Sequence, residues 1–184
     1  MTAPPRPTVR SKRAADILAA ARHILEEEGA DALTMRRLAA ALGVQAPSLY
    51  KHFPTKRALE GALVEQGMLE LGSALHGAIE AAGRRRVPVS RLLETYRKAA
   101  LANPGLYRLA TAGPLVNEAL ADGLEAWAGE PFFLATGDPW NAQALFSFAH
   151  GMVMLELDGR FPPGSDLGRT WRAGAVAFSY GRRA

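Results

Sequence analysis

The sequence lacks several features that would restrict its class. It contains no cysteine, which excludes disulfide bonds and metal sites built from thiolates. It has no run of about eighteen apolar residues, the length that a membrane-spanning helix needs. The opening stretch MTAPPRPTVRSKR is basic but leads into no apolar segment, so we expect no secretory signal. We therefore expect a cytoplasmic protein.

The patterns that mark common catalytic and cofactor sites are also missing. There is no nucleophile elbow, Walker loop or dinucleotide-binding glycine motif. The histidines, His23, His52, His76 and His150, lack the spacing of four residues that pairs zinc ligands on a helix. No segment shows the alternation of a strand. We expect an all-α protein that is not an enzyme and uses no cofactor and no metal.

Acidic residues are absent from one long stretch. No Asp or Glu occurs between Asp31 and Glu60. The net charge is +4, with ten Lys/Arg and six Asp/Glu in residues 1–60 and twelve of each in residues 61–184. The whole positive excess lies in the N-terminal third, which is typical of a nucleic-acid-binding region beside a neutral body. The acid-free stretch carries five cations: Arg36, Arg37, Lys51, Lys56 and Arg57.

The same stretch has the pattern of two short helices joined by a turn. Thr34 is expected to cap the first helix, and Gly43 stands where a left-handed residue ends it. The second helix starts near Gln45 and buries Leu49 and Phe53, four residues apart. Two short helices around a glycine-containing turn indicate a helix-turn-helix.

The region from about residue 12 to 60 resembles the DNA-binding domain of the TetR family of bacterial transcriptional regulators. The C-terminal region resembles the subgroup marked by a Trp, here Trp140, and a His-Gly pair, here His150-Gly151. The residues that carry the family pattern are Ile17, Leu18, Ala20, Ala21, Gly29, Leu33, Thr34, Arg36, Leu38, Ala39, Leu42, Gly43, Val44, Ser48, Leu49, Tyr50, His52, Phe53, Lys56 and Leu59.

This resemblance implies a set of contacts to double-stranded DNA. Arg36 and Lys51 are expected to reach base edges in the major groove. Four residues are expected along the groove: Gln45, Ala46, Pro47 and Ser48. Four more are expected to hold phosphates: Thr34, Tyr50, His52 and Lys56.

The chain divides into three expected parts. Residues 1–10 form a flexible basic arm, residues 11–57 the helix-turn-helix DNA-binding domain, and residues 58–184 a helical-bundle domain for ligand binding and dimerisation. About nine helices are expected. Among them, Ser90 caps one helix, Pro114 begins another that ends near Trp127, and 129–139 is a loop with glycine and proline at both ends.

Large, soft side chains of the body suit an apolar, flat ligand, although residues of this kind usually fill cores. Few charges fall among them, so a neutral or weakly polar effector is favoured. The candidate ligand-binding residues are Tyr96, Tyr107, Trp127, Phe132, Phe133, Phe146, His150 and Met154.

The last two long helices are apolar over more than half of their circumference, which a solvent-facing helix should not be. The family resemblance implies that they pair with their copies in a homodimer. The expected interface residues are Leu145, Val153, Leu157, Leu167, Trp171 and Phe178.

The sequence thus predicts a ligand-responsive regulator, a repressor that binds an inverted-repeat operator as a homodimer and leaves it when a small effector binds. The sign of regulation stays open, because an activator or a dual regulator has the same pattern. The body also has two alternatives: a protein-interaction module without a small ligand, and an all-α enzyme or carrier.

Overall fold

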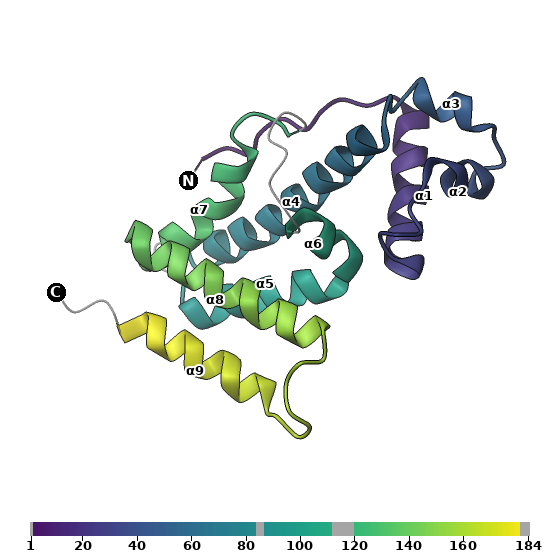
Figure 1. The fold of residues 1–184 in the computed structure, drawn as a ribbon. Coiled ribbons are helices and arrows are strands. Elements are labelled where there is room, and N and C mark those ends of the chain that lie inside the picture. The colour runs from purple at the N-terminus through teal and green to yellow at the C-terminus, as the bar shows by residue number, and fades with distance from the viewer. Residues whose placement is uncertain (1, 84–86, 112–119, 181–184) are drawn as a thin grey trace. The chain divides into compact units, whose positions relative to one another are not determined.

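The computed structural model describes residues 2–83, 87–111 and 120–180, which form nine α-helices and no strand (Figure 1). The expected all-α fold is therefore confirmed. The helices are α1 (Lys12–Glu28), α2 (Met35–Ala41), α3 (Ala46–Tyr50), α4 (Lys56–Ala81), α5 (Val89–Ala102), α6 (Pro104–Thr111), α7 (Leu124–Thr136), α8 (Pro139–Leu157) and α9 (Leu167–Tyr180).

The described residues form two compact units. The head unit comprises those of Pro5–Leu69 and Asn103–Leu124, and the body unit those of Met1–Pro4, Glu70–Ala102 and Glu125–Ala184. The division falls within α4, which gives its first half to the head unit and its second half to the body unit. The sequence did not suggest that α6 belongs to the head unit.

Polar side chains cap several helices, and the cap predicted at Thr34 is among them. Backbone N–H groups of the first turn donate to Ser11, Thr34, Thr55 and Asp166 at 3.2, 3.0, 3.0 and 2.8 Å. The prediction that Ser90 caps a helix was wrong by two residues. Because α5 already begins at Val89, Ser90 lies inside the first turn.

The expected loop at 129–139 was a larger error. It is helical as far as Thr136, with Pro131 inside α7. Phe132 and Ala135 are buried, so burial of apolar side chains outweighs the local tendency of glycine and proline to end a helix. The start that we predicted at Pro114 lies outside the described residues.

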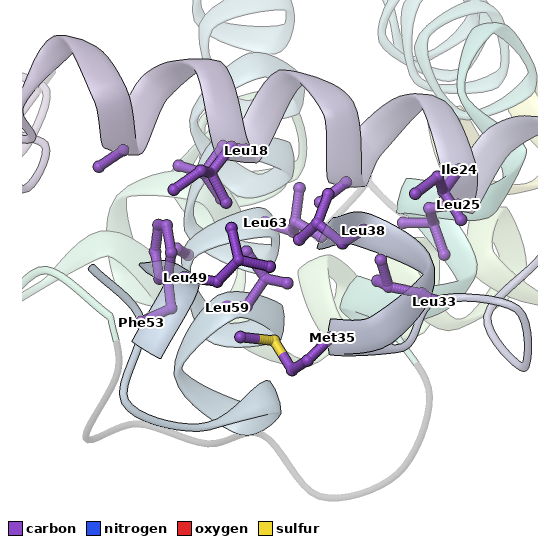
Figure 2. Close-up of a cluster of buried hydrophobic side chains, with 14 of the residues drawn as sticks. Leu18, Ile24, Leu25, Leu33, Met35, Leu38, Leu49, Phe53, Leu59 and Leu63 are labelled. Carbon is purple, nitrogen blue, oxygen red and sulfur yellow. The ribbon is translucent and has the colours of Figure 1, made fainter. Parts of the chain in front are cut away.

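Apolar side chains of α1 to α4 fill the core of the head unit. In Figure 2, Leu18 and Leu25 extend from α1 toward the side that carries Leu38, Leu49 and Leu59. All five are buried. Burying each such side chain contributes about 1.5–3 kcal/mol, which fixes α2 and α3 against α1.

A carboxylate of α1 fastens α6 to the head unit. Glu26 accepts hydrogen bonds from the backbone N–H groups of Gly105 and Leu106, both at 2.8 Å. The two helices meet closely, because a Cβ on Gly105 would lie 2.6 Å from the carbonyl oxygen of Leu25. Only glycine fits at this crossing without a shift of the backbone.

In the body unit, α5, α8 and α9 pack together (Figure 1). Glu156 of α8 accepts hydrogen bonds from Arg97 of α5 at 3.0 and 2.6 Å, and from Trp171 of α9 at 3.2 Å. Burial raises the pKa of Glu156, but these hydrogen bonds and the charge of Arg97 outweigh it, so its pKa lies below the ordinary value. One carboxylate therefore joins three helices.

The part of the chain that the structure describes has neither a membrane-spanning helix nor a cluster of metal ligands. No helix there has the length and apolar character of a membrane span. No group of three or more His, Cys, Asp or Glu side chains there is placed to hold a metal ion. His76 is instead buried, and its ring stacks on that of Trp127 with centroids 4.6 Å apart.

Candidate nucleic-acid interface

The turn between α2 and α3 has the predicted geometry. Gly43 adopts a φ of +64°, the left-handed conformation that ends a helix, and the next N–H, of Val44, donates to the carbonyl of Ala39 at 3.0 Å. Leu38 and Leu49 are fully buried and pack the two helices together. The segment is a helix-turn-helix, and its buried face sets which side chains face outward.

The outward face of the helix-turn-helix carries the residues that we predicted for DNA. With Leu49 inward, helical rotation of about 100° per residue turns Pro47 and Lys51 away from the core. Seven of the predicted residues are exposed: Thr34, Arg36, Gln45, Pro47, Tyr50, Lys51 and His52. Ala46, Ser48 and Lys56 are half-buried.

Not every cation near this face is available to a ligand. The guanidinium of Arg37 donates to the carboxylate of Glu28 at 2.9 and 2.5 Å. This hydrogen bond lowers the pKa of Glu28 and raises that of Arg37. Arg36 has no ion-pair partner among the described residues, so the charge of Arg37 is paired and that of its neighbour Arg36 is not.

Two residues that we predicted to contact DNA already interact with other residues of the chain. Lys56 lies 3.2 Å from the carboxylate of Glu60, one turn along α4. Exposed pairs of this kind contribute only about 0.3–0.5 kcal/mol, so a phosphate can displace Glu60. Ser48 donates its hydroxyl to the carbonyl of Gln45 at 2.8 Å, and its oxygen can still accept a hydrogen bond.

The predicted ligand-binding residues fall in both units. Tyr107 is buried on α6, in the head unit. In the body unit, Tyr96, Phe132 and Phe146 form edge-to-face contacts with centroids 5.6 to 6.4 Å apart, and Phe146 stacks on His150 at 6.1 Å. The remaining three lie in the body unit: Trp127 is buried, Met154 half-buried and Phe133 exposed.

Several predicted dimer residues are already covered within one chain. Leu145 and Val153 are fully buried, and Trp171 is 6% exposed. The apolar character of α8 and α9 is therefore partly explained by burial within one chain. Leu157, Leu167 and Phe178 are half-buried.

The small residues of α8 and α9 also differ in role. A Cβ on Gly174 would lie 2.1 Å from the ring of Phe148, so this glycine serves packing within the chain. A Cβ on Gly151 would meet nothing within 4 Å. The apolar side chains that stay exposed on these two helices include Leu155, at 40%, and Val176, at 52%.

Comparison with known proteins places the helix-turn-helix in a family. Residues 17–63 match the model of the bacterial regulatory proteins, tetR family. The tetracycline repressor protein class A from transposon 1721 of Escherichia coli is 52% identical over 54 residues, 29% of this chain and 25% of that protein. Nucleoid occlusion factor SlmA of Vibrio vulnificus is 33% identical over 116 residues, 61% of this chain and 59% of that protein. The match thus spans less than two thirds of these relatives.

Solved structures extend the likeness to the rest of the chain. A protein of unknown function from Rhodococcus sp. RHA1 is 27% identical with a TM-score of 0.74, covering 96% of this chain and 98% of that one. BioQ of Mycobacterium smegmatis is 25% identical with a TM-score of 0.62, covering 91% and 95%. The likeness therefore includes the helices after the helix-turn-helix.

An N-terminal helix-turn-helix followed by an all-helical body defines a class of DNA-binding transcriptional regulators. Residues 17–63 place the helix-turn-helix domain in the TetR family of that class, as the sequence indicated. Regulators of this family are DNA-binding proteins and not enzymes.

Proposed function

We propose that this protein is a homodimeric repressor that binds an inverted-repeat operator and leaves it when a small effector binds the body unit. One observation carries the DNA-binding part: the outward face of α2 and α3 is exposed and polar, and its cations Arg36 and Lys51 have no ion-pair partner among the described residues. The fold suits this role, since it occurs in BioQ crystallised with its double-stranded DNA operator (TM-score 0.57).

The proposed contacts follow from position. Arg36 reaches a guanine edge, where a bidentate pair contributes about 1–3 kcal/mol of discrimination. Lys51 reads the neighbouring bases, and the residues from Gln45 to Ser48 lie along the groove. Thr34, Tyr50, His52 and Lys56 hold the phosphates that fix the register.

Homodimerisation is supported by the exposed apolar side of α8 and α9. The open Gly151 allows another helix to approach. Leu155, one turn along the same helix, and Val176 of α9 offer exposed apolar area. A two-fold axis covers both patches with a single self-complementary surface. The same axis places two copies of α3 about 34–36 Å apart, in successive major grooves.

The effector site is proposed around the aromatic cluster of the body unit. Tyr96, Phe132, Phe146 and His150 come from α5, α7 and α8, and an apolar cluster with one polar edge suits a flat, weakly polar compound. Phe146 is 44% exposed, so the cluster is accessible from solvent.

Coupling between effector and DNA is proposed to run through α4 and α6. Residues of α4 belong to both units. The body helix α5 leads directly into α6, which Glu26 fastens to α1. An effector that prefers the free protein must weaken DNA binding by the same factor.

The DNA-binding part is tested by charge reversal. Lys51→Glu should abolish the binding of duplex DNA in fluorescence anisotropy, whereas Lys98→Glu, at an exposed lysine of α5, should leave most of it. Equal loss in both variants would contradict the placement of the interface.

The effector part is tested by thermal shift with a panel of aromatic compounds. A compound that raises Tm and also releases DNA supports the effector. If no compound raises Tm, the protein-interaction alternative is favoured.

A further inference from the structure

A fully buried carboxylate in the head unit is bound by the residues just before α1. Glu65, on α4, is 0% exposed. Its carboxylate accepts hydrogen bonds from the backbone N–H and the hydroxyl of Thr8 at 3.3 and 2.8 Å. Its other oxygen lies 2.5 Å from the guanidinium of Arg10, which also donates to the carbonyl of Thr8 at 3.4 Å. A charge buried this deeply persists only when such partners satisfy it.

The arm that carries these contacts, residues 2–10, contains two arginines in different situations. Arg10 is paired with Glu65, and its side chain is 21% exposed. Arg6 is exposed and has no ion-pair partner among the described residues. In the sequence, Arg6 and Arg10 are both cations of a basic arm. In the structure, Arg10 is paired with Glu65 and only the charge of Arg6 is unpaired within the arm.

We propose that Glu65 is a positioning residue for DNA binding, and that it anchors the arm through Thr8 and Arg10 so that Arg6 contacts a DNA phosphate. Arg10 serves the anchor and makes no DNA contact. An anchored arm loses less freedom on binding than a free one, so the contact of Arg6 is stronger. This inference rests on the proposed DNA-binding function.

Replacing Glu65 should change DNA affinity in the direction opposite to the one that charge alone predicts. Glu65→Gln removes a negative charge and frees Arg10, and both changes alone would strengthen DNA binding. With the anchor lost, operator affinity should instead fall several-fold. Glu60→Gln is the matched control on the same helix. It frees Lys56 and should leave affinity unchanged or higher.

Limited trypsin digestion tests the anchor without DNA. Arg6 precedes Pro7 and resists trypsin, so Arg10 is the cleavage site of the arm. Cleavage after Arg10 should be slow in the native protein and several-fold faster in Glu65→Gln. Thr8→Val changes an exposed residue outside the core and should act in the same direction. Equal rates in all three proteins would overturn the anchor.

Operator binding then tests the role of the anchor. Arg6→Ala should lower the slope of log affinity against log salt by about 0.9, the value for one phosphate contact. In a Glu65→Gln background, Arg6→Ala should cost nothing further, whereas a merely structural Glu65 predicts additive losses. Additive losses, or tighter binding by Glu65→Gln, would overturn the inference. If the native protein binds no DNA, the proposed function fails instead, and the digestion result stands.

Discussion

His76 donates a hydrogen bond to a carbonyl of α7 that a proline leaves unpaired. Nε2 of His76 lies 2.9 Å from the carbonyl oxygen of Trp127. In a regular helix that carbonyl accepts from the N–H four residues later, but position 131 is proline and has no N–H. Because a carbonyl only accepts, Nε2 carries the proton. A side chain of α4 thus supplies the hydrogen bond that Pro131 cannot donate to the carbonyl of Trp127.

A double-mutant cycle tests this relationship. His76→Phe keeps a ring on Trp127 but removes the donor, and a buried carbonyl left unpaired costs about 1–3 kcal/mol of unfolding free energy. Pro131→Ala supplies the missing N–H, so His76→Phe should cost clearly less in that background. Urea denaturation measures both costs. Equal costs would show that the hydrogen bond of His76 does not replace that of the proline.

The capping of α6 by Glu26 predicts a stability difference between two neighbouring glutamates. Glu26→Gln removes the charge that caps the first N–H groups of α6, and loss of a cap costs about 0.5–2 kcal/mol. Glu27→Gln, at an exposed position beside it, should change stability by less than about 0.5 kcal/mol. Thermal unfolding of the two variants decides the point, and indistinguishable Tm values would contradict the role of Glu26.

Features that depend on a few adjacent residues were predictable from the sequence. The cap at Thr34 and the left-handed Gly43 are set by local chemistry, and both occur as expected. The partners of Glu26 and Glu28 were not predictable, because they come from α6 and α2. The helix macrodipole disfavours these carboxylates at the end of α1. In the sequence, the unfavourable position of Glu26 and Glu28 at the end of a helix is therefore the feature that hints at distant partners.

Dependence on residues distant in the sequence also explains the wrong predictions for the body unit. Gly129 and Pro131 suggest a loop locally, but the buried surface of Phe132 and the donor supplied by His76 keep α7 helical. Apolar periodicity also cannot tell a side chain buried within one chain, such as Leu145, from one exposed for a partner, such as Leu155.

Glu156 predicts a pH dependence of stability. Its folded pKa lies below its ordinary value of 4.5, so the stabilisation is complete above that value and is lost as the pH falls through the lower folded pKa. The native protein should therefore exceed Glu156→Gln in stability at neutral pH, and the difference should shrink below pH 4.5. Urea midpoints of both proteins across this range measure it. A difference that is constant with pH would contradict the charged pairing with Arg97.

The exposed apolar side of α8 and α9 predicts the oligomeric state. Leu155→Glu or Val176→Glu should place like charges across the two-fold axis and give a folded monomer. Ala126→Glu, at an exposed position of α7, should remain a dimer. Size-exclusion chromatography with light scattering distinguishes these outcomes. A native monomer at micromolar concentration, or dimeric variants, would place the interface elsewhere.

We expect α2 and α3 to read an inverted-repeat operator, and selection from a pool of random duplex DNA tests this expectation most directly. The native protein should enrich a near-palindrome whose half-sites lie about 34–36 Å apart. Arg36→Ala should enrich a degenerate base at one position in each half-site, whereas Arg37→Ala, whose guanidinium is held by Glu28, should keep the native preference. No enrichment by the native protein, or an asymmetric motif that Arg36→Ala leaves unchanged, would contradict the account.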